Sequence, residues 1–261
     1  MLLDGKKYAE AKVSELKERA SKLPKKPMLA IIQVCGDTAS DVYVQNKFKR
    51  CIEVGIIPKL FYFLDDTPQW KVEDKILELN RDNEITGILL QLPLPKHLDA
   101  EYLTNLIDPR KDVDGFTETN TGRLSLGKPG NVPCTAKGVI DMLDFYDISM
   151  EGKDVLIINR SDIVGKPLAR LMTNKDATVT LCHSKSKLSN HLYDSDLIVC
   201  AVGQAGFLNC YPIHCPVIDV GINFIKDSEG RSQLVGDAFN TDGRNVTPVP
   251  GGVGLLTRLT L

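Results

Sequence analysis

The 261-residue sequence has no CxxC pair, no long block of charge of one sign and no apolar run long enough to cross a membrane. Its cysteines, seven in number, lie mostly in apolar runs such as VTLC and LIVC, which is typical of small buried side chains in a reducing cytosol. The formal net charge is −2, so a basic surface for nucleic acid is not predicted. The N-terminal stretch MLLDGKKYAE lacks the layout of a signal peptide. These absences favour a soluble cytoplasmic protein that binds neither nucleic acid nor membranes.

A metal-binding motif of the usual spacing is missing as well. Cys210, His214 and Cys215 lie near one another in the chain, but their spacing fits no structural zinc pattern. We therefore predict that the protein holds no metal ion.

The sequence does contain a repeated alternation of strand-like apolar runs with helical patterns, and this order predicts an α/β fold with parallel sheets. Strands are predicted over 28–34, 59–63, 87–92, 154–159, 177–182, 196–202 and 216–222, and helices over 4–23, 38–55, 68–81, 135–147 and 164–172. A long polar segment, 107–135, interrupts the alternation. A stretch of that length without regular structure is usually a functional loop.

The second half of the chain has the order strand, turn, helix, strand, which binds dinucleotides at the carboxyl ends of the strands. Its first turn, NRSDIVGKP, lacks the GxGxxG pattern and retains only Gly165, which lets the following helix pack closely. Asn159, Arg160 and Ser161 begin this turn, where the phosphates or ribose of a cofactor would lie, and Val164 comes just before the glycine.

The end of the next strand distinguishes between cofactors. A fold that binds NAD usually has a carboxylate there for the ribose 2′-hydroxyl, whereas this strand ends in His183, Ser184 and Lys185. Hydrogen-bond donors and a cation, with Arg160 nearby, suit a 2′-phosphate, so NADP is favoured over NAD. The alternative is that these residues form a solvated loop.

Three more loops of the second half are rich in glycine, which lets a backbone come close to a ligand. Gly203 lies in AVGQAG, Gly221 and Ile222 lie in DVGIN, and the segment 247–254 reads TPVPGGVG. The last of these could also be a plain turn.

The first half offers four polar candidates. Tyr43 and Lys47 lie one helical turn apart on one face, which is either a solvated surface or a phenol ring that partly desolvates an ammonium for proton transfer. Gln91 ends a buried strand, where an amide is unfavourable unless it is bonded, so we expect it to face a cleft. Asp114 lies in a glycine-flanked loop, where it either stabilises a turn or accepts hydrogen bonds from a ligand.

Nine segments, in order along nearly the whole chain, resemble the bifunctional methylenetetrahydrofolate dehydrogenase/methenyltetrahydrofolate cyclohydrolase family. They are ASDVYVQNKFKRCIEVGI, GILLQLPLP, KDVDGFTETNTGRL, PCTAKG, RSDIVGKPLARLM, ATVTLCHSKS, VGQAG, DVGIN and TPVPGGVG. Any one of these is a weak signal, whereas nine in the family's order are very specific.

The resemblance implies an NADP-dependent homodimer of one-carbon metabolism, which supplies purine biosynthesis. A folate-binding domain would comprise 1–136 with 254–261, and a Rossmann-type NADP-binding domain would comprise 137–253. The first reaction would move a hydride from 5,10-methylenetetrahydrofolate to the nicotinamide, and the second would hydrolyse the 5,10-methenyl cation to 10-formyltetrahydrofolate.

The resemblance also implies residue roles. Tyr43 would stack on the folate, Lys47 would be the key residue of hydrolysis, Gln91 would tune that lysine, and Asp114 would bind the pterin. Substrate contacts are further implied for Leu92 and for Pro250, Gly251 and Gly252.

Two other functions fit part of this pattern. A dehydrogenase of the shikimate or amino-acid type would keep the fold but would not explain LPLP together with KDVDGF. A non-catalytic dinucleotide-binding module would agree with Asn159, because the family usually has glycine there. Since asparagine tolerates positive φ better than most residues, we expect the turn to survive this change.

Overall fold

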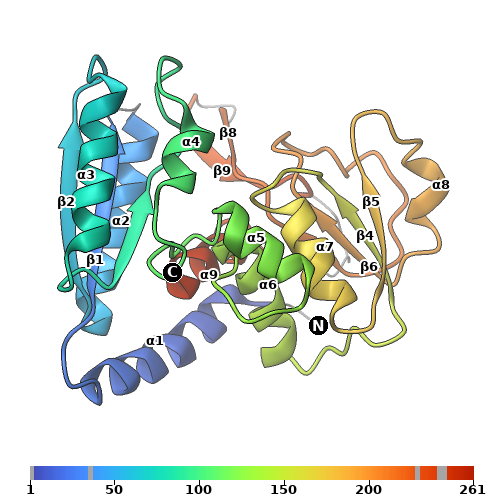
Figure 1. Cartoon of the computed structure of the whole chain (residues 1–261). Coiled ribbons are helices and arrows are strands. Elements are labelled where there is room, and N and C mark those ends of the chain that lie inside the picture. The colour runs from blue at the N-terminus through green and yellow to red at the C-terminus, as the bar shows by residue number, and fades with distance from the viewer. Residues whose placement is uncertain (1–2, 35–37, 227–229, 240–245) are drawn as a thin grey trace. The chain divides into compact units, whose positions relative to one another are not determined.

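The computed structural model describes residues 3–34, 38–226, 230–239 and 246–261, with side chains over the same ranges except 38–43. The chain divides into two compact units (Figure 1). The N-terminal unit comprises Ala11–Val132 with Leu261, and the C-terminal unit comprises Met1–Glu10 and Pro133–Thr260. Helix α1 (Gly5–Ser21) begins in the C-terminal unit and ends in the N-terminal unit.

The N-terminal unit is built on a parallel three-stranded sheet in the order β2-β1-β3. Its elements after α1 are β1 (Met28–Val34), α2 (Thr38–Val54), β2 (Ile57–Phe63), α3 (Gln69–Arg81), β3 (Gly87–Leu90), α4 (Ala100–Asn105) and α5 (Glu118–Ser125). Ile31 of β1 pairs with Leu60 on one side and with Leu89 on the other. Gly55, with φ of +88°, ends α2 in the left-handed conformation that favours glycine.

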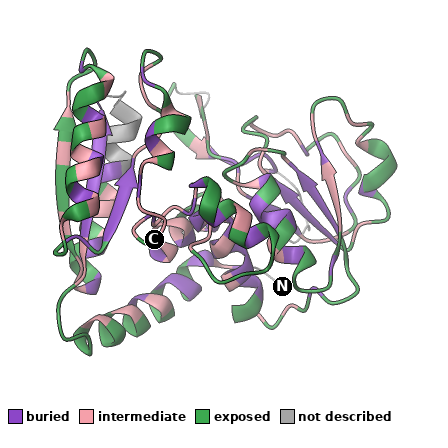
Figure 2. Cartoon of the chain, in the orientation of Figure 1, coloured by how far each residue is buried: buried purple, intermediate pink, exposed green. Residues whose placement is uncertain are grey.

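Burial separates the strands of this sheet. Every residue of β3, and every residue of β1 after Met28, is buried, which agrees with their continuous apolar sequences (Figure 2). Ile32 and Ile88 pack in one apolar cluster with Val72 and Ile76 of α3. Among the described strands β2 pairs with β1 alone, and several large apolar side chains of β2 are exposed. It is therefore an edge strand. The core of this unit is formed mainly by the buried side chains of β1 and β3.

The C-terminal unit is built on a parallel four-stranded sheet in the order β5-β4-β6-β7. Its elements are α6 (Cys134–Phe145), β4 (Asp154–Ile158), α7 (Gly165–Thr173), β5 (Thr178–Cys182), α8 (Ser189–Leu192), β6 (Leu197–Cys200), β7 (Val217–Asp219), the antiparallel pair β8 (Asn223–Lys226) and β9 (Ser232–Val235), and α9 (Val253–Thr260). Alternate residues of β4 contribute to two apolar clusters, Val155 and Ile157 to one and Leu156 and Ile158 to the other. Because β4 pairs with β5 on one side and β6 on the other, its carboxyl end lies where the strand order reverses.

Helix α9 belongs to the C-terminal unit. Leu256 is fully buried, and a Cβ on Gly138 of α6 would lie 3.0 Å from the Cβ of Leu256. The division therefore differs from the predicted one, which ended the first domain at residue 136 and returned 254–261 to it. The reason is that the helices α6 and α9 pack closely through a small residue, a contact that no local sequence pattern reveals.

The predicted α/β fold with parallel sheets is confirmed, and each predicted strand and helix has a counterpart. The polar segment 107–135 was expected to lack regular structure, but it contains α5, which Thr117 begins by accepting a hydrogen bond from the amide of Asn120. Helices α4, α8 and α9 and the pair β8–β9 were also not predicted. Among the described residues no helix is both long and apolar enough to span a membrane.

Candidate active site

A cavity of about 580 Å³ opens in the C-terminal unit at the carboxyl ends of β4, β5 and β6. Its lining includes five of the predicted cofactor residues, namely Asn159, Arg160, Ser161, His183 and Ser184. Four other predicted positions lie within or next to these segments in the chain, namely Val164, Gly165, Lys185 and Gly203, whereas Gly221 and Ile222 follow β7 and are not among the lining residues. A cavity at the point where strand order reverses is where an open α/β sheet binds a dinucleotide.

The Asn159 side chain organises the turn between β4 and α7. Its Oδ1 accepts hydrogen bonds from the Ser161 amide at 2.7 Å, the Ser161 hydroxyl at 2.7 Å and the Gly165 amide at 3.1 Å. Its Nδ2 donates to the Ala201 carbonyl, just beyond β6, at 2.6 Å. One amide side chain therefore ties together the ends of β4 and β6 and the start of α7.

The turn forms with asparagine at residue 159, but Asn159 does not use the positive φ that this residue type tolerates. Among the described non-glycine residues only Asp147 and Asp176 have positive φ. Asparagine is accommodated here because its amide satisfies polar groups inside the turn, which conformational preference alone does not predict. Gly165 is required for packing, since a Cβ at this position would lie 2.2 Å from the Asn159 carbonyl oxygen.

The segment after β5 is a hydrogen-bonded turn. The Ser186 hydroxyl accepts from the His183 amide at 3.0 Å, and His183 Nδ1 accepts from the Lys185 amide at 3.1 Å. When His183 is neutral, this second bond leaves the ring proton on Nε2. Arg160, Ser184 and Lys185 are exposed, and the six residues that follow β5, HSKSKL, include no aspartate or glutamate. The donors and cations at this wall suit a phosphate better than a ribose hydroxyl.

In the N-terminal unit the structure brings Lys47 and Gln91 into contact. The Nζ of Lys47, on α2, lies 3.1 Å from Oε1 of Gln91, which follows β3. The Gln91 amide donates to Ile32 of β1 at 2.9 Å, and its Nε2 donates to the Leu92 carbonyl at 2.6 Å. The backbone of the sheet and the next peptide thus fix Gln91, and Gln91 fixes the lysine. The side chain of Tyr43, one turn before Lys47, lies outside the described residues.

Cys51, one turn beyond Lys47 on α2, is buried. Burial raises the pKa of its thiol to about 11, and the positive charge of Lys47 lowers that pKa in part. Cys51 therefore stays a neutral thiol beneath the lysine at physiological pH.

Asp112 organises the loop that carries Asp114. The buried Asp112 carboxylate accepts hydrogen bonds from the amides of Gly115 and Thr117, both at 2.9 Å, from the Thr117 hydroxyl at 2.8 Å and from Asn120 Nδ2 at 2.9 Å. Asp114 is half-buried in the same loop. Asp114 was predicted as a site residue and Asp112 was not, although the two share the motif KDVDG. Asp112 could have been found, because an aspartate followed within five residues by glycine and threonine is typical of turns stabilised by a side chain.

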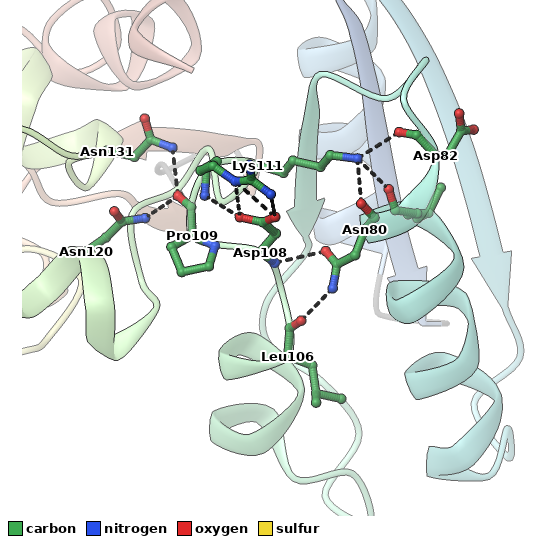
Figure 3. Close-up of polar contacts among 10 residues, drawn as sticks. Asn80, Asp82, Leu106, Asp108, Pro109, Lys111, Asn120 and Asn131 are labelled. Atoms are coloured by element: carbon green, nitrogen blue, oxygen red, sulfur yellow. Dashed lines mark hydrogen bonds and ion pairs between the residues drawn. The ribbon is translucent and has the colours of Figure 1, made fainter.

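Lys111 fastens this loop to the end of α3 (Figure 3). Its ammonium donates to the carbonyl oxygens of Leu79 and Asn80, both at 2.9 Å, and of Asp82 at 2.7 Å. The last carbonyls of a helix lack partners within it, and a cation is favourable there. Asn131 holds the other side of the loop through a 2.6 Å bond from Nδ2 to the Asp112 carbonyl. The loop is therefore held in place by its own side chains Lys111 and Asp112, by Asn120 of α5 and by Asn131.

The glycine-rich segment 247–252 lies in the C-terminal unit. A Cβ on Gly5, at the start of α1, would lie 2.5 Å from the Gly251 carbonyl oxygen and 2.6 Å from that of Gly252. A Cβ on Gly252 would lie 2.5 Å from the Pro248 carbonyl oxygen. Packing within the protein therefore accounts for glycine at residues 5 and 252, and Gly251 has φ of +115°.

In the described part of the chain no three His, Cys, Asp or Glu side chains converge as metal ligands would. The His214 ring instead packs edge-on against Tyr193, with ring centroids 5.6 Å apart. Four of the cysteines are buried, as predicted: Cys51, Cys134, Cys182 and Cys200.

The fold and these two sites define a two-domain α/β enzyme with a dinucleotide-binding domain. Sequence models of tetrahydrofolate dehydrogenase/cyclohydrolase match the chain twice, the catalytic domain over residues 3–114 and the NAD(P)-binding domain over 133–261. The chain therefore belongs to the tetrahydrofolate dehydrogenase/cyclohydrolase family, whose members are oxidoreductases and hydrolases of tetrahydrofolate one-carbon chemistry.

Similar proteins cover almost the whole chain. The bifunctional protein FolD of Agathobacter rectalis is 40% identical over 98% of this chain and 94% of its own length, and that of Salinibacter ruber is 42% identical over 100% and 92%. The crystal structure of FolD from Campylobacter jejuni has a TM-score of 0.94 at 39% identity and covers 100% of this chain and 95% of that one. The enzyme of Trypanosoma brucei, complexed with NADP and an inhibitor, has a TM-score of 0.91 at 32% identity and covers 100% and 94%.

Proposed function

We propose that this protein oxidises 5,10-methylenetetrahydrofolate with NADP and hydrolyses the resulting 5,10-methenyl cation to 10-formyltetrahydrofolate. Family membership over both domains supports the reaction pair. The contact between Lys47 and Gln91 is the main support for the hydrolysis reaction, because hydrolysis needs a positioned group that accepts and donates a proton.

NADP fits the residues of the cavity in the C-terminal unit. Arg160, Ser184 and Lys185 offer two cations and a hydroxyl near the end of β5, and a carboxylate that would repel a 2′-phosphate is absent there. The Trypanosoma brucei relative was solved with NADP. When bound, NADP supplies the nicotinamide that accepts the hydride. The protein's part in this step is to orient the cofactor, because the turn stabilised by Asn159 and the cations that bind the 2′-phosphate fix its position.

Lys47 carries the proton of the hydrolytic step. As the amine, Nζ takes a proton from the water that attacks the methenyl carbon. It returns that proton to N5 of the folate as the bond between that carbon and N5 breaks, and the hydroxyl proton goes to solvent as the formyl group forms on N10. Gln91 Oε1 accepts a hydrogen bond from Nζ and holds the nitrogen in one place.

The remaining substrate contacts follow the family resemblance. Asp114 accepts hydrogen bonds from the pterin, in a loop that Asp112 and Lys111 hold rigid. Tyr43 stacks on the folate, and Leu92, Pro250, Gly251 and Gly252 line its site. These roles are supported by the motifs in which the residues lie.

The protein works as a homodimer in the cytoplasm, and its partners are folates rather than nucleic acid or membranes. Strand β2 supports dimerisation, because it lies at the end of the strand order, where a strand of a second copy could extend the sheet. Several of its large apolar side chains are also exposed: Ile57 at 40%, Leu60 at 38% and Tyr62 at 50%, followed by Leu64 at 64%.

An assay of the purified protein tests the function. With 5,10-methylenetetrahydrofolate, we expect the methenyl and 10-formyl products to form with NADP and to form more slowly with NAD. If neither cofactor yields a methenyl product, the dehydrogenase assignment is wrong. If the methenyl compound is not hydrolysed faster than in buffer, the cyclohydrolase assignment is wrong.

A further inference from the structure

A second buried carboxylate, Asp237, lies beneath the loops at the cofactor cavity. It is fully buried, and its Oδ2 accepts from the amides of Val202 at 2.6 Å and Gly203 at 3.0 Å. Its Oδ1 accepts from the Gln204 amide at 2.9 Å and from Asn223 Nδ2 at 2.9 Å. A buried carboxylate is stable only when such bonds replace its hydration, so this cluster is a specific structural device.

Asp219, at the end of β7, holds Asp237 in place. Its Oδ1 accepts from the amides of Gly221 at 2.8 Å and Asp237 at 3.0 Å, and its Oδ2 accepts from the Ala238 amide at 2.7 Å. Burial raises the pKa of Asp219, its three amide donors lower that pKa, and the nearby Asp237 carboxylate raises it again. The backbone position of Asp237 thus depends on the strand that ends at Asp219.

Two glycines are shaped to this pair of carboxylates. A Cβ on Gly221 would lie 2.3 Å from Asp237 Oδ1, and a Cβ on Gly236 would lie 1.9 Å from Asp219 Oδ2. Neither glycine has positive φ, so the requirement is space rather than conformation. The glycine of DVGIN is therefore explained by a carboxylate of the protein itself.

The loop that Asp237 holds is part of the cavity wall. Val202 and Gln204 line the cavity, and Gly203 between them has φ of +74°. Consecutive amides in such a loop form a concave site for an anion. The Asp237 carboxylate occupies that site and accepts hydrogen bonds from all three amides. Val202 and Gln204 therefore line the cavity, while the amides of the loop are bonded to Asp237. Through Asn223 the same carboxylate also fixes the segment after β7.

We propose that Asp237 is a positioning residue for the dehydrogenase reaction. It acts on the segment 202–204 through its backbone amides and on the segment 221–223 through the Asn223 side chain. The nicotinamide half of the dinucleotide must lie over these two segments once its 2′-phosphate is at the end of β5 and its diphosphate is at the β4–α7 turn. This inference rests on the proposed function. It predicts that Asp237 serves NADP oxidation–reduction and has no part in the hydrolytic step, which needs no cofactor.

The Asp237→Asn variant keeps the shape but not the acceptors. An asparagine offers one acceptor oxygen, and its NH2 group would face amide donors. We expect kcat/KM for NADP in the dehydrogenase reaction to fall at least tenfold with a raised KM for NADP. Hydrolysis of the methenyl compound and binding of adenosine 2′,5′-bisphosphate should change less than twofold. Asp196→Asn is the matched control, since Asp196 is exposed at the start of β6, and we expect both activities to be unchanged.

Three results would overturn the inference while leaving the proposed function intact. The first is an equal loss of dehydrogenase and hydrolytic activity. The second is that binding of adenosine 2′,5′-bisphosphate weakens as much as binding of NADP, and the third is an unchanged kcat/KM in the dehydrogenase reaction. If Asp237→Asn does not fold, Asn223→Ala removes only one donor, and a loss confined to the dehydrogenase is again expected. Absence of dehydrogenase activity in the unaltered protein would instead refute the proposed function.

Discussion

The two sites of this molecule are prepared in different ways. In the N-terminal unit the two side chains proposed for hydrolysis, Lys47 and Gln91, are already hydrogen-bonded at 3.1 Å. In the C-terminal unit the cationic side chains Arg160 and Lys185 are exposed. The backbone segments there are instead fixed by hydrogen bonds to the side chains of Asn159 and Asp237. The proposed hydrolytic centre is thus preformed in its side chains, whereas the proposed cofactor site is preformed in its backbone.

The difference follows from what each site must do. A lysine that moves a proton needs a fixed neighbour, because a small displacement from the reacting atoms is costly. A cation that binds a phosphate gains most of its interaction when the ligand arrives, so it needs no partner within the protein. In both units a buried carboxylate that accepts backbone amides supplies the rigidity.

The largest expected effect comes from Asp112, the buried carboxylate of the N-terminal unit. Asp112→Ala leaves five hydrogen-bond donors, including the Asn120 side chain, without their acceptor. We expect the free energy of unfolding to fall by more than about 3 kcal/mol and both activities to decrease, because buried donors are left unsatisfied. Denaturant unfolding measures this, with Asp74→Ala on the exposed face of α3 as control. Unchanged unfolding would show that the carboxylate does not hold the loop.

Arg160→Ala tests the exposed side of the cofactor site. The dissociation constant for NADP should rise about tenfold or more, since a charge-assisted bond to the 2′-phosphate is lost, whereas that for NAD should change by about twofold at most. Calorimetric titration with both dinucleotides gives the ratio, and Arg170→Ala on α7 is the control. Equal effects on NADP and NAD would mean that Arg160 does not read the 2′-phosphate.

A smaller effect is expected from Lys111→Met. The change removes three bonds to carbonyls at the end of α3 and should lower the free energy of unfolding by about 1–3 kcal/mol. The KM for the folate should rise while the KM for NADP stays the same, because the loop of Asp114 loosens. Steady-state kinetics with Lys128→Met as control measure this split. A change in both KM values would point to a general loss of structure.

The smallest effect concerns an exposed ion pair. Hydrogen bonds from Arg110 lower the pKa of Asp108 to about 2, below its ordinary value of 3.8. This stabilisation is present above pH 3.8 and is lost as the pH falls toward 2. Because Arg110 is 84% exposed, Arg110→Met should lower the free energy of unfolding only slightly at pH 5, and this difference should shrink as the pH falls through 2. Unfolding curves between pH 5 and pH 1 measure it, and a difference that stays constant down to pH 1 would contradict the assignment.

Much of this organisation could be predicted from the sequence. The run MLAIIQV predicts the bounds of β1, and the reasoning that a buried amide needs a partner agrees with the hydrogen bonds between Gln91 and both Lys47 and Leu92. Helix α5 was missed because its eight residues are mostly polar, although Thr117 and Glu118 at its start are typical of a helix N-terminus.

Two of the three buried carboxylates could not be predicted in the same way. Asp112 binds amides within the next five residues, whereas Asp219 and Asp237 bind amides 18 to 35 residues away, which converge only after the chain has folded back on itself. Nothing in the identity of residues 202–204 indicates that their amides surround a carboxylate at residue 237. The role of Asn159 was also hidden, because its amide acts on β6, which is distant in the sequence.

The most direct test of the preformed hydrolytic centre is a time course of the Lys47→Met variant with 5,10-methylenetetrahydrofolate and NADP. We expect NADPH to form and the methenyl compound to accumulate, while 10-formyl production falls about 100-fold or more, in the range of a lost proton-transfer group. Lys49→Met, on an exposed position of the same helix, should behave like the unaltered protein. Undiminished 10-formyl production in Lys47→Met would contradict the account.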